Sequence, residues 1–422
     1  MNIWIVTIGE PIINNQDNLR LHRHGLLANY ISSNTDHKVI WWTSLFNHFT
    51  KKFEFENEKE YSPNKKLTVK LIKGNGYKKN VSIARILDHW KIKKRFAKKI
   101  LNEIEKPDLI IASFPTIGLC NESIKYGNVN NIPVLIDYRD LWPEAFEDIA
   151  PNFLKPIVKT ILYPLHIYTN YVLKGASGII GITDKFLNIA LNKINRKQNY
   201  FDNYFPHTYK KLLLSAEDLT IQSDYWFSKS VKDDDSIKIC FFGTLGHQFD
   251  LETVVEGFNN LKEQNIKLII CGSGHKKDHL IKMANNNPNI IFPGYMNAKQ
   301  IKYLLSISHI GLCPYLPKKM FLEAIPGKII EYMSEGLELL TTLDKGVVGQ
   351  IVVKNNFGLN YLPFDKMSFI DCVEELCKKI DNNKSNKQKI INYYDQNFDQ
   401  NSVLKKYVYH IEKVVENAKD YI

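Results

Sequence analysis

Short apolar runs alternate with helix-like segments in two series along this 422-residue chain. The first series extends from Ile3 to Thr183 and the second from Ile237 to Tyr361. The runs are rich in β-branched residues, which favour strands, and the segments between them repeat apolar residues at helical spacing. Strands that alternate with helices form parallel sheets with helical crossovers. We therefore predict an α/β protein with two Rossmann-like, doubly wound domains.

A polar segment between the two series marks the predicted domain boundary. Residues 215–236 are rich in charged and hydroxyl side chains, and a strand-like run restarts at Ile237. We predict an N-terminal domain over residues 1–210 and a C-terminal domain over residues 211–401. An apolar stripe predicts a final helix over residues 402–422, with Ser402 as its N-cap.

The composition excludes several classes of protein. With 44% hydrophobic and 24% charged residues, the chain is neither disordered nor collagen-like. Its six cysteines include no CxxC pair, which argues against a structural zinc site and a disulfide framework and suits a reducing cytoplasm. The first residues lack the basic and apolar regions of a signal peptide. No apolar run approaches the ~18 residues typical of a transmembrane helix.

The positive charge is concentrated in one region. The net charge is +11, and residues 51–100 alone contain 16 Lys or Arg against 5 Asp or Glu. Residues 78–100 predict a basic amphipathic helix, or two in tandem, and residues 152–174 predict a second basic, aromatic one. Such surfaces bind anionic lipid headgroups or nucleic acid, although each is also compatible with an ordinary solvated helix face. No nucleic-acid motif accompanies the charge, so we favour a membrane surface.

Glycine-containing turns follow three strands of the second series. A glycine turn ahead of a helix lets a ligand approach the backbone, and helix N-termini suit phosphate. Tyr295, at the end of the third strand, is suited to stack on a nucleobase. The alternative is that the turns are only tight connections and that Tyr295 only packs. The candidate ligand-binding residues in these turns are Gly243, Thr244, Gly246, Gly272, Gly274, Gly294 and Tyr295.

The segment FLEAIPGKIIEYMSEG, from Phe321 to Gly336, contains two carboxylates eight positions apart. Pro326 and Gly327 form a turn between them, and a helix starts directly afterwards. We predict that a pyrophosphate docks on the exposed N–H groups of this turn, with Lys328 as a nearby point charge. Glu331 is placed to bind a ribose diol and Glu323 to bind sugar hydroxyls. The alternative is two ordinary carboxylates at a helix start.

These motifs resemble a known family. The E-x7-E spacing in PGKIIEYMSEG, with IIFPGY, IGLCPY and FFGTLG, resembles the retaining, nucleotide-sugar-dependent glycosyltransferases of family 4. IDYRDLWPEAF, from Ile136 to Phe146, resembles the RDLWPE segment of members that build bacterial polysaccharides. The resemblance covers most of the chain. It implies the GT-B fold, in which two Rossmann-like domains flank a cleft and a C-terminal helix crosses back to the first domain.

The resemblance also implies roles for residues of both domains. Asp140, Glu323 and Lys328 are the implied catalytic residues. Gly9, Arg139 and Trp142 are the implied acceptor-binding residues. The implied donor-binding residues are the glycine-turn set named above together with Pro326, Gly327 and Glu331. Many relatives carry an Arg and a Lys beside the phosphate turn, where this chain has Thr244 and then His247 and Gln248. We therefore assign neutralisation of the diphosphate to Lys328.

The resulting expectation is a retaining transferase in bacterial capsule, O-antigen or other surface polysaccharide synthesis. It would use a UDP- or GDP-type sugar donor and a saccharide or polyprenyl-linked acceptor, with no metal and no cofactor besides the donor as co-substrate. We expect a cytoplasmic protein, peripheral on the anionic inner face of the cell membrane, that binds no nucleic acid. The alternatives are a nucleotide-sugar epimerase of the same fold and a non-catalytic basic protein that binds membrane or nucleic acid.

Overall fold

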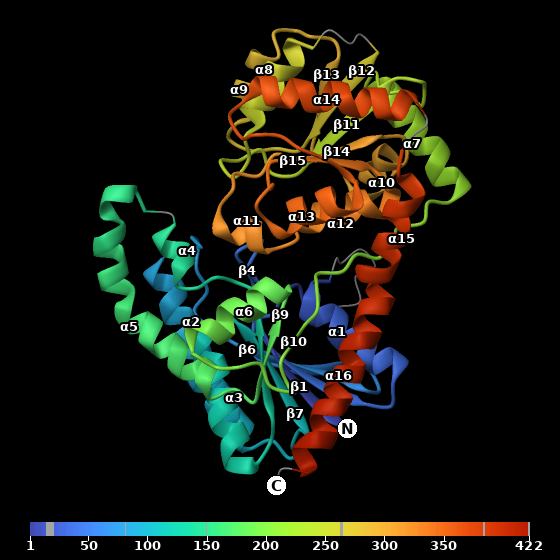
Figure 1. Cartoon of the computed structure of the whole chain (residues 1–422). Coiled ribbons are helices and arrows are strands. Elements are labelled where there is room, and N and C mark those ends of the chain that lie inside the picture. The colour runs from blue at the N-terminus through green and yellow to red at the C-terminus, as the bar shows by residue number, and fades with distance from the viewer. Residues whose placement is uncertain (14–20, 81, 149, 262–264, 383–384, 421–422) are drawn as a thin grey trace. The chain divides into compact units, whose positions relative to one another are not determined.

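The computed structural model describes residues 1–13, 21–80, 82–148, 150–261, 265–382 and 385–420. The chain divides into two compact units, whose elements are labelled in Figure 1. Unit 1 comprises Met1–Pro206 and Leu404–Ile422, and unit 2 comprises His207–Val403. The chain thus passes between units after Pro206 and after Val403, whereas the sequence analysis placed these bounds after residues 210 and 401.

Unit 1 contains an eight-stranded sheet in the order β10-β9-β8-β7-β1-β2-β6-β5. All neighbouring strands are parallel except β5, which runs antiparallel to β6. Local sequence pattern did not predict β5, β10 or the antiparallel pair β3 and β4. The strands are β1 (Asn2–Val6), β2 (Lys38–Ser44), β3 (Phe46–Asn47), β4 (Lys52–Phe53), β5 (Glu60–Asn64), β6 (Leu67–Ile72), β7 (Leu109–Phe114), β8 (Val134–Tyr138), β9 (Gly178–Gly181) and β10 (Asn203–Tyr204).

Helices cover this sheet, and α2, α3 and α5 pack in a row, with α3 between the other two (Figure 1). The central strands β7 and β8 are buried along their whole length, as expected for parallel strands with helices on both faces. The helices are α1 (Arg23–Asn34), α2 (Ile83–Leu101), α3 (Ile117–Asn130), α4 (Glu144–Glu147), α5 (Lys155–Lys174) and α6 (Asp184–Lys193), with a 3-10 turn at Asn152–Leu154.

The last helix, α16 (Gln400–Asp420), starts in unit 2 and packs mainly in unit 1. Its apolar stripe is buried, and Tyr407 stacks on Phe205 with ring centroids 4.3 Å apart. The helix starts two residues earlier than predicted. The Asp399 carboxylate accepts a hydrogen bond from the Ser402 backbone N–H at 3.0 Å, so Asp399 caps the helix and Ser402 lies inside its first turn. The prediction of Ser402 as the N-cap was therefore wrong.

Unit 2 contains six parallel strands in the order β13-β12-β11-β14-β15-β16. From β11 the chain first adds β12 and β13 on one side and then β14, β15 and β16 on the other. The order in which the chain adds strands therefore reverses between β11 and β14. In such sheets, ligands bind at this switch point, outside the carboxyl ends of the strands. The strands are β11 (Ile237–Phe242), β12 (Ile266–Cys271), β13 (Ile290–Gly294), β14 (Ile310–Cys313), β15 (Glu338–Thr341) and β16 (Gly358–Asn360).

Helices connect these strands and bury their apolar faces on the sheet. They are α7 (Ala216–Ser228), α8 (Leu251–Asn259), α9 (Lys277–Met283), α10 (Ala298–Ser306), α11 (Lys319–Glu323), α12 (Gly327–Glu335), α13 (Val347–Asn355), α14 (Lys366–Asp381) and α15 (Lys387–Asn397). None of the helices in the described residues combines the length and apolar character needed to cross a membrane.

The glycine turns after β11 and β12 pack directly on each other. A Cβ on Gly272 would lie 1.8 Å from the Gly243 carbonyl oxygen, and a Cβ on Gly274 would lie 2.3 Å from the Leu245 carbonyl oxygen. Backbone hydrogen bonds join the turns, with Leu245 N–H donating to the Ser273 carbonyl at 2.8 Å. Gly272 and Gly274 therefore make room for the neighbouring turn, which holds the Gly243 turn in place.

Candidate functional site

Lys328 lies in the first turn of α12, beside the Gly243 turn. Both are at the carboxyl ends of the strands of unit 2, near the switch point between β11 and β14. A Cβ built on Gly243 would lie 3.0 Å from Lys328 Nζ. Three aromatic rings enclose this amine, because Nζ lies 3.9 Å from the ring centroid of Phe241, 4.0 Å from that of Phe249 and 5.3 Å from that of Tyr315. Nζ is buried and has no hydrogen-bond partner among the described residues.

Burial lowers the pKa of Lys328 to about 7, because the charged form loses its hydration. The aromatic faces attract the ammonium, and the nearby Glu331 also favours it, but neither replaces a hydrogen-bonding anion. The amine therefore changes protonation near neutral pH. A phosphate oxygen beside Nζ would supply the partner that Lys328 lacks.

The start of α12 provides a second group suited to an anion. Pro326 precedes the helix in an extended conformation and makes no side-chain cap hydrogen bond, so no cap from this residue competes for the first N–H groups. Nothing described lies within 4 Å of a Cβ built on Gly327, so the helix N-terminus has open space beside it. A nine-residue helix whose N-terminus meets open space attracts negative charge.

The two predicted carboxylates flank this helix start. Glu323 ends α11 and is half-buried, whereas Glu331 lies one turn into α12 and is only 6% exposed. Both side chains have contacts within the protein. The structure thus brings together Gly243, Lys328 and the start of α12, which the two carboxylates flank. All lie at the carboxyl ends of the strands of unit 2.

The other predicted donor-binding residues lie in three places. Thr244 is exposed next to Gly243, and Gly246 is buried, with a built Cβ 2.5 Å from the Gln248 side-chain oxygen. Gly294 ends β13 with φ +89°, and its carbonyl accepts a hydrogen bond from Gly272 N–H at 2.7 Å. Tyr295, directly after it, is 79% exposed. Its ring is therefore available to a flat ligand, whereas Gly272 and Gly274 face the neighbouring turn.

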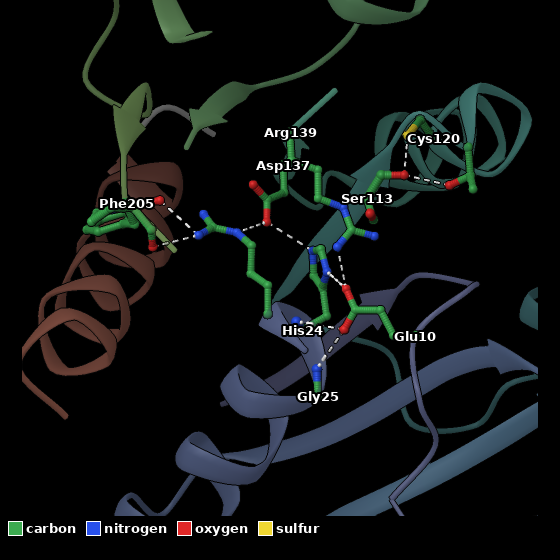
Figure 2. A network of polar contacts seen from close by, with 11 residues as sticks. Glu10, His24, Gly25, Ser113, Cys120, Asp137, Arg139 and Phe205 are labelled. Carbon is green, nitrogen blue, oxygen red and sulfur yellow. Dashed lines mark hydrogen bonds and ion pairs between the residues drawn. The ribbon is translucent and has the colours of Figure 1, made fainter. Parts of the chain in front are cut away.

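Unit 1 contains a buried ionic network that the sequence analysis missed (Figure 2). The Glu10 carboxylate lies 2.8 Å from His24 Nδ1 and accepts a hydrogen bond from Arg139 at 2.5 Å. His24 Nε2 lies 3.0 Å from the Asp137 carboxylate, which also accepts a hydrogen bond from Arg23 at 2.6 Å. Arg23 and His24 lie at the start of α1, and Asp137 lies on β8. The network therefore ties the loop after β1 to the carboxyl end of β8.

The charges of this network support one another. Burial alone would raise the pKa of Glu10, but Arg139 and His24 hold it well below its usual range. Burial alone would also raise the pKa of Asp137, but Arg23 and His24 hold this pKa well below its usual range. The two carboxylates in turn raise the pKa of His24 against the effect of burial. The network therefore stays ionised and fixes Arg139 in position.

A pocket of about 210 Å³ opens beside this network, at the carboxyl ends of β1, β7 and β8. Asp140 Oδ1 is buried there without a hydrogen-bond partner among the described residues, and burial raises the pKa of this carboxyl group. Trp142 stands next to the pocket, because the Arg85 guanidinium lies 5.3 Å from its ring centroid. The residues that line the pocket with polar groups are Gly9, His48, Tyr77, Arg85, His89, Thr116, Arg139 and Asp140.

The predicted acceptor-side residues are thus brought together in unit 1. Gly9, Arg139 and Asp140 line one pocket, and Trp142 contacts another of its walls. Sequence reasoning missed Glu10 and His24, which pair with each other over 14 positions and with Arg139 and Asp137 over more than 100. A carboxylate directly after the glycine of the first βα turn was the one available signal.

Comparison with known proteins agrees with this architecture. Residues 222–395 match the family model described as glycosyl transferases group 1. Sucrose-phosphate synthase from Thermosynechococcus elongatus superimposes with a TM-score of 0.71 at 13% identity, over 99% of each chain. HepE from Anabaena in complex with UDP gives 0.66 at 11% identity, over 98% of this chain and 99% of HepE. WaaG, a glycosyltransferase involved in lipopolysaccharide biosynthesis, gives 0.61 at 14% identity, over 96% and 98%. No curated protein sequence matches the chain.

The chain is a glycosyltransferase with the GT-B fold. The expected fold class, two Rossmann-like units with parallel sheets, is therefore confirmed. The match to the family model lies within unit 2 and includes both the Gly243 turn and α12, which carries Lys328. Within the described residues, the glycosyltransferase has no group of three or more His, Cys, Asp or Glu side chains placed to hold a metal ion.

We predict that Lys328→Met stabilises the unliganded glycosyltransferase in a pH-dependent way. The folded lysine has a pKa of about 7 and an unfolded one about 10.5, so the unfolded state binds more protons between these values. The cost of burying Lys328 is therefore largest at and below pH 7 and declines towards pH 10. The melting temperature of Lys328→Met should exceed that of the wild type most at pH 6–7, and the difference should shrink by pH 10.

Lys319→Met, which replaces an exposed lysine of α11, is the control and should give a difference that does not follow pH in this way. Differential scanning calorimetry at pH 6, 7, 8, 9 and 10 measures both variants. A Lys328→Met difference that stays constant from pH 6 to pH 10 would show that this lysine keeps an ordinary protonation equilibrium in the folded protein.

Proposed function

We propose that this glycosyltransferase is a retaining enzyme of family 4 that takes a sugar from a UDP-type donor. The observation that supports it most strongly is Lys328 Nζ, which lies buried and without a hydrogen-bond partner among the described residues, beside the Gly243 turn and the start of α12. A diphosphate placed there would accept hydrogen bonds from Nζ and from the first N–H groups of the helix. The UDP complex of HepE, a protein of the same fold, supports the choice of nucleotide.

The same groups would act during bond cleavage. As the anomeric carbon leaves the diphosphate, negative charge grows on the β-phosphate, and Lys328 and the α12 N–H groups are already placed to stabilise it. We therefore propose that the enzyme uses no metal cofactor, because this charge is met by groups of the chain itself. Glu331 would bind the ribose diol, Glu323 the hydroxyls of the transferred sugar, and Gly294 and Tyr295 the base.

Retention of configuration follows if the acceptor hydroxyl attacks from the face that the diphosphate leaves. The leaving phosphate oxygen would then take the proton of that hydroxyl, so no protein nucleophile is required. Asp140, whose Oδ1 lies buried without a hydrogen-bond partner among the described residues, would accept a hydrogen bond from the acceptor and orient it. Arg139, held by Glu10, and Gly9 would form the walls of this acceptor site.

We further propose that the enzyme works on a polyprenyl-linked saccharide at the inner face of the cell membrane, in surface polysaccharide synthesis. The support is that α2 and α5 expose apolar side chains that a solvated helix face would not need. Ile83 and Ile86 of α2 are 75% and 68% exposed, and Ile161 of α5 is 70% exposed. Exposed Lys94 and Lys98 on α2 add positive charge that favours anionic lipids.

A nucleotide screen tests the donor site. We expect UDP to raise the melting temperature of the wild type more than GDP, ADP or CMP, since a ligand that binds only the folded state stabilises it. Glu331→Gln should reduce the UDP shift, because a carboxamide is a weaker acceptor for the ribose diol. Glu335→Gln lies on the same helix, where Glu335 pairs with Lys302, and should retain the shift. Equal UDP shifts in wild type and Glu331→Gln would refute the ribose role.

Vesicle sedimentation tests the membrane surface. The double variant Lys94→Glu, Lys98→Glu should pellet less than the wild type with phosphatidylglycerol vesicles, and neither protein should pellet with phosphatidylcholine vesicles at physiological salt. The matched double variant Lys345→Glu, Lys354→Glu reverses the same charge on exposed residues of unit 2 and should pellet as the wild type does. If the two double variants lose vesicle binding equally, α2 is not the membrane-facing element.

A further inference from the structure

Arg85 differs from the other arginines among the residues that the structure describes. Arg23, Arg95, Arg139 and Arg196 each pair with a carboxylate, in Asp137, Glu58, Glu10 and Asp202 respectively. Arg85 has no carboxylate partner among the described residues, although it lies in the first turn of α2 and lines the unit 1 pocket.

The surroundings of Arg85 leave much of its hydrogen-bonding capacity unused. One terminal nitrogen donates to the Asn80 carbonyl at 2.9 Å, whereas Nε is buried without a hydrogen-bond partner among the described residues. The guanidinium lies 5.3 Å from the Trp142 ring centroid and 5.7 Å from that of Tyr77. Two aromatic rings thus hold a planar cation at the pocket wall, where it is suited to bind phosphate oxygens.

The rest of the pocket also favours an anion. Arg139 stands on another wall, fixed by Glu10. His48 and His89 line the pocket as well, and burial, with a contribution from Arg85, lowers the pKa of each to about 4. Both imidazoles are therefore neutral at pH 7 and can donate N–H hydrogen bonds. Asp140 is the acidic side chain that faces these groups, and burial raises the pKa of its carboxyl group.

An apolar surface lies next to Arg85 on the same helix. Ile83, Ile86, Leu87 and Trp90 of α2 are all more than half exposed. A ligand that reaches Arg85 therefore meets positive charge in the pocket and an apolar helix face beside it. Free phosphate would use the first of these features only, whereas a lipid phosphate would use both.

We propose that the unit 1 pocket binds the diphosphate of a polyprenyl-linked acceptor, with Arg85 as its main anion contact and the exposed apolar face of α2 against the first isoprene units. This inference rests on the proposed function for the role of the ligand as acceptor. The binding site itself stands on the pocket, the unpaired guanidinium and the adjoining apolar residues. It assigns to Arg85 a role in substrate specificity, because acceptors without a diphosphate would leave its nitrogen donors without partners.

Isothermal titration calorimetry of the full chain with farnesyl diphosphate tests this site. Farnesyl diphosphate should bind more tightly than farnesol or inorganic pyrophosphate, because only the first ligand combines charge with an apolar chain. Arg85→Gln should weaken its binding at least tenfold, about 1.4 kcal/mol. Arg95→Gln is the matched control on the same helix, where Arg95 pairs with Glu58 outside the pocket, and should bind as the wild type does.

The outcomes separate this inference from the donor site. Arg85→Gln should keep the full UDP thermal shift, which also shows that the variant is folded. Arg85-dependent binding of farnesyl diphosphate without any UDP shift would support the pocket and refute the proposed donor. A retained UDP shift with equal binding of farnesyl diphosphate by wild type and Arg85→Gln would overturn the inference. Pyrophosphate binding as tight as that of farnesyl diphosphate would also overturn it, because the lipid would then contribute nothing.

Discussion

The proposed donor site depends on one buried amine. Lys328 Nζ is enclosed by the rings of Phe241, Phe249 and Tyr315 and has no hydrogen-bond partner among the described residues. Burying a charged group without a partner is costly, and its pKa falls towards neutrality as a result. This unfavourable burial occurs at the carboxyl ends of the strands of unit 2, where ligands of such sheets bind. A diphosphate that supplies the missing partner would recover part of this free energy as affinity.

In unit 1, the buried charges of the network around His24 are paired, unlike that of Lys328. In this buried network, each charged side chain has a neighbour of opposite charge, so the side chains stay ionised without a ligand in the pocket. The network contains Glu10, His24, Asp137 and Arg139. Its function is to hold the loops that carry Arg139 and Asp140. Arg85, at the wall of the same pocket, has no carboxylate partner among the described residues. The fully paired groups therefore support the pocket, whereas Arg85 and Asp140, whose polar atoms are only partly satisfied, line the wall that we propose to bind the acceptor.

The sequence predicted what depends on local pattern. Apolar periodicity predicted the two α/β units, and the turn at Pro326 and Gly327 predicted the helix start that carries Lys328. It did not predict that Gly272 and Gly274 make room for a neighbouring turn, because a missing side chain fits a ligand and a backbone equally well. Ser402 and Asp399 are both good N-caps, so only the helix start decides between them. Arg139, which pairs with Glu10, lies 129 positions further along the chain, so local pattern could not predict this contact. The predicted ligand roles stay predictions.

The most direct test is a crystal structure of the wild-type protein with UDP. We expect density for the nucleotide on unit 2, with β-phosphate oxygens within hydrogen-bond distance of Lys328 Nζ and of the first N–H groups of α12. We also expect the ribose diol to lie within hydrogen-bond distance of the Glu331 carboxylate. A complex in which UDP binds elsewhere, while Nζ remains enclosed by the three aromatic rings without a polar partner, would contradict the proposed role of Lys328 in binding the diphosphate.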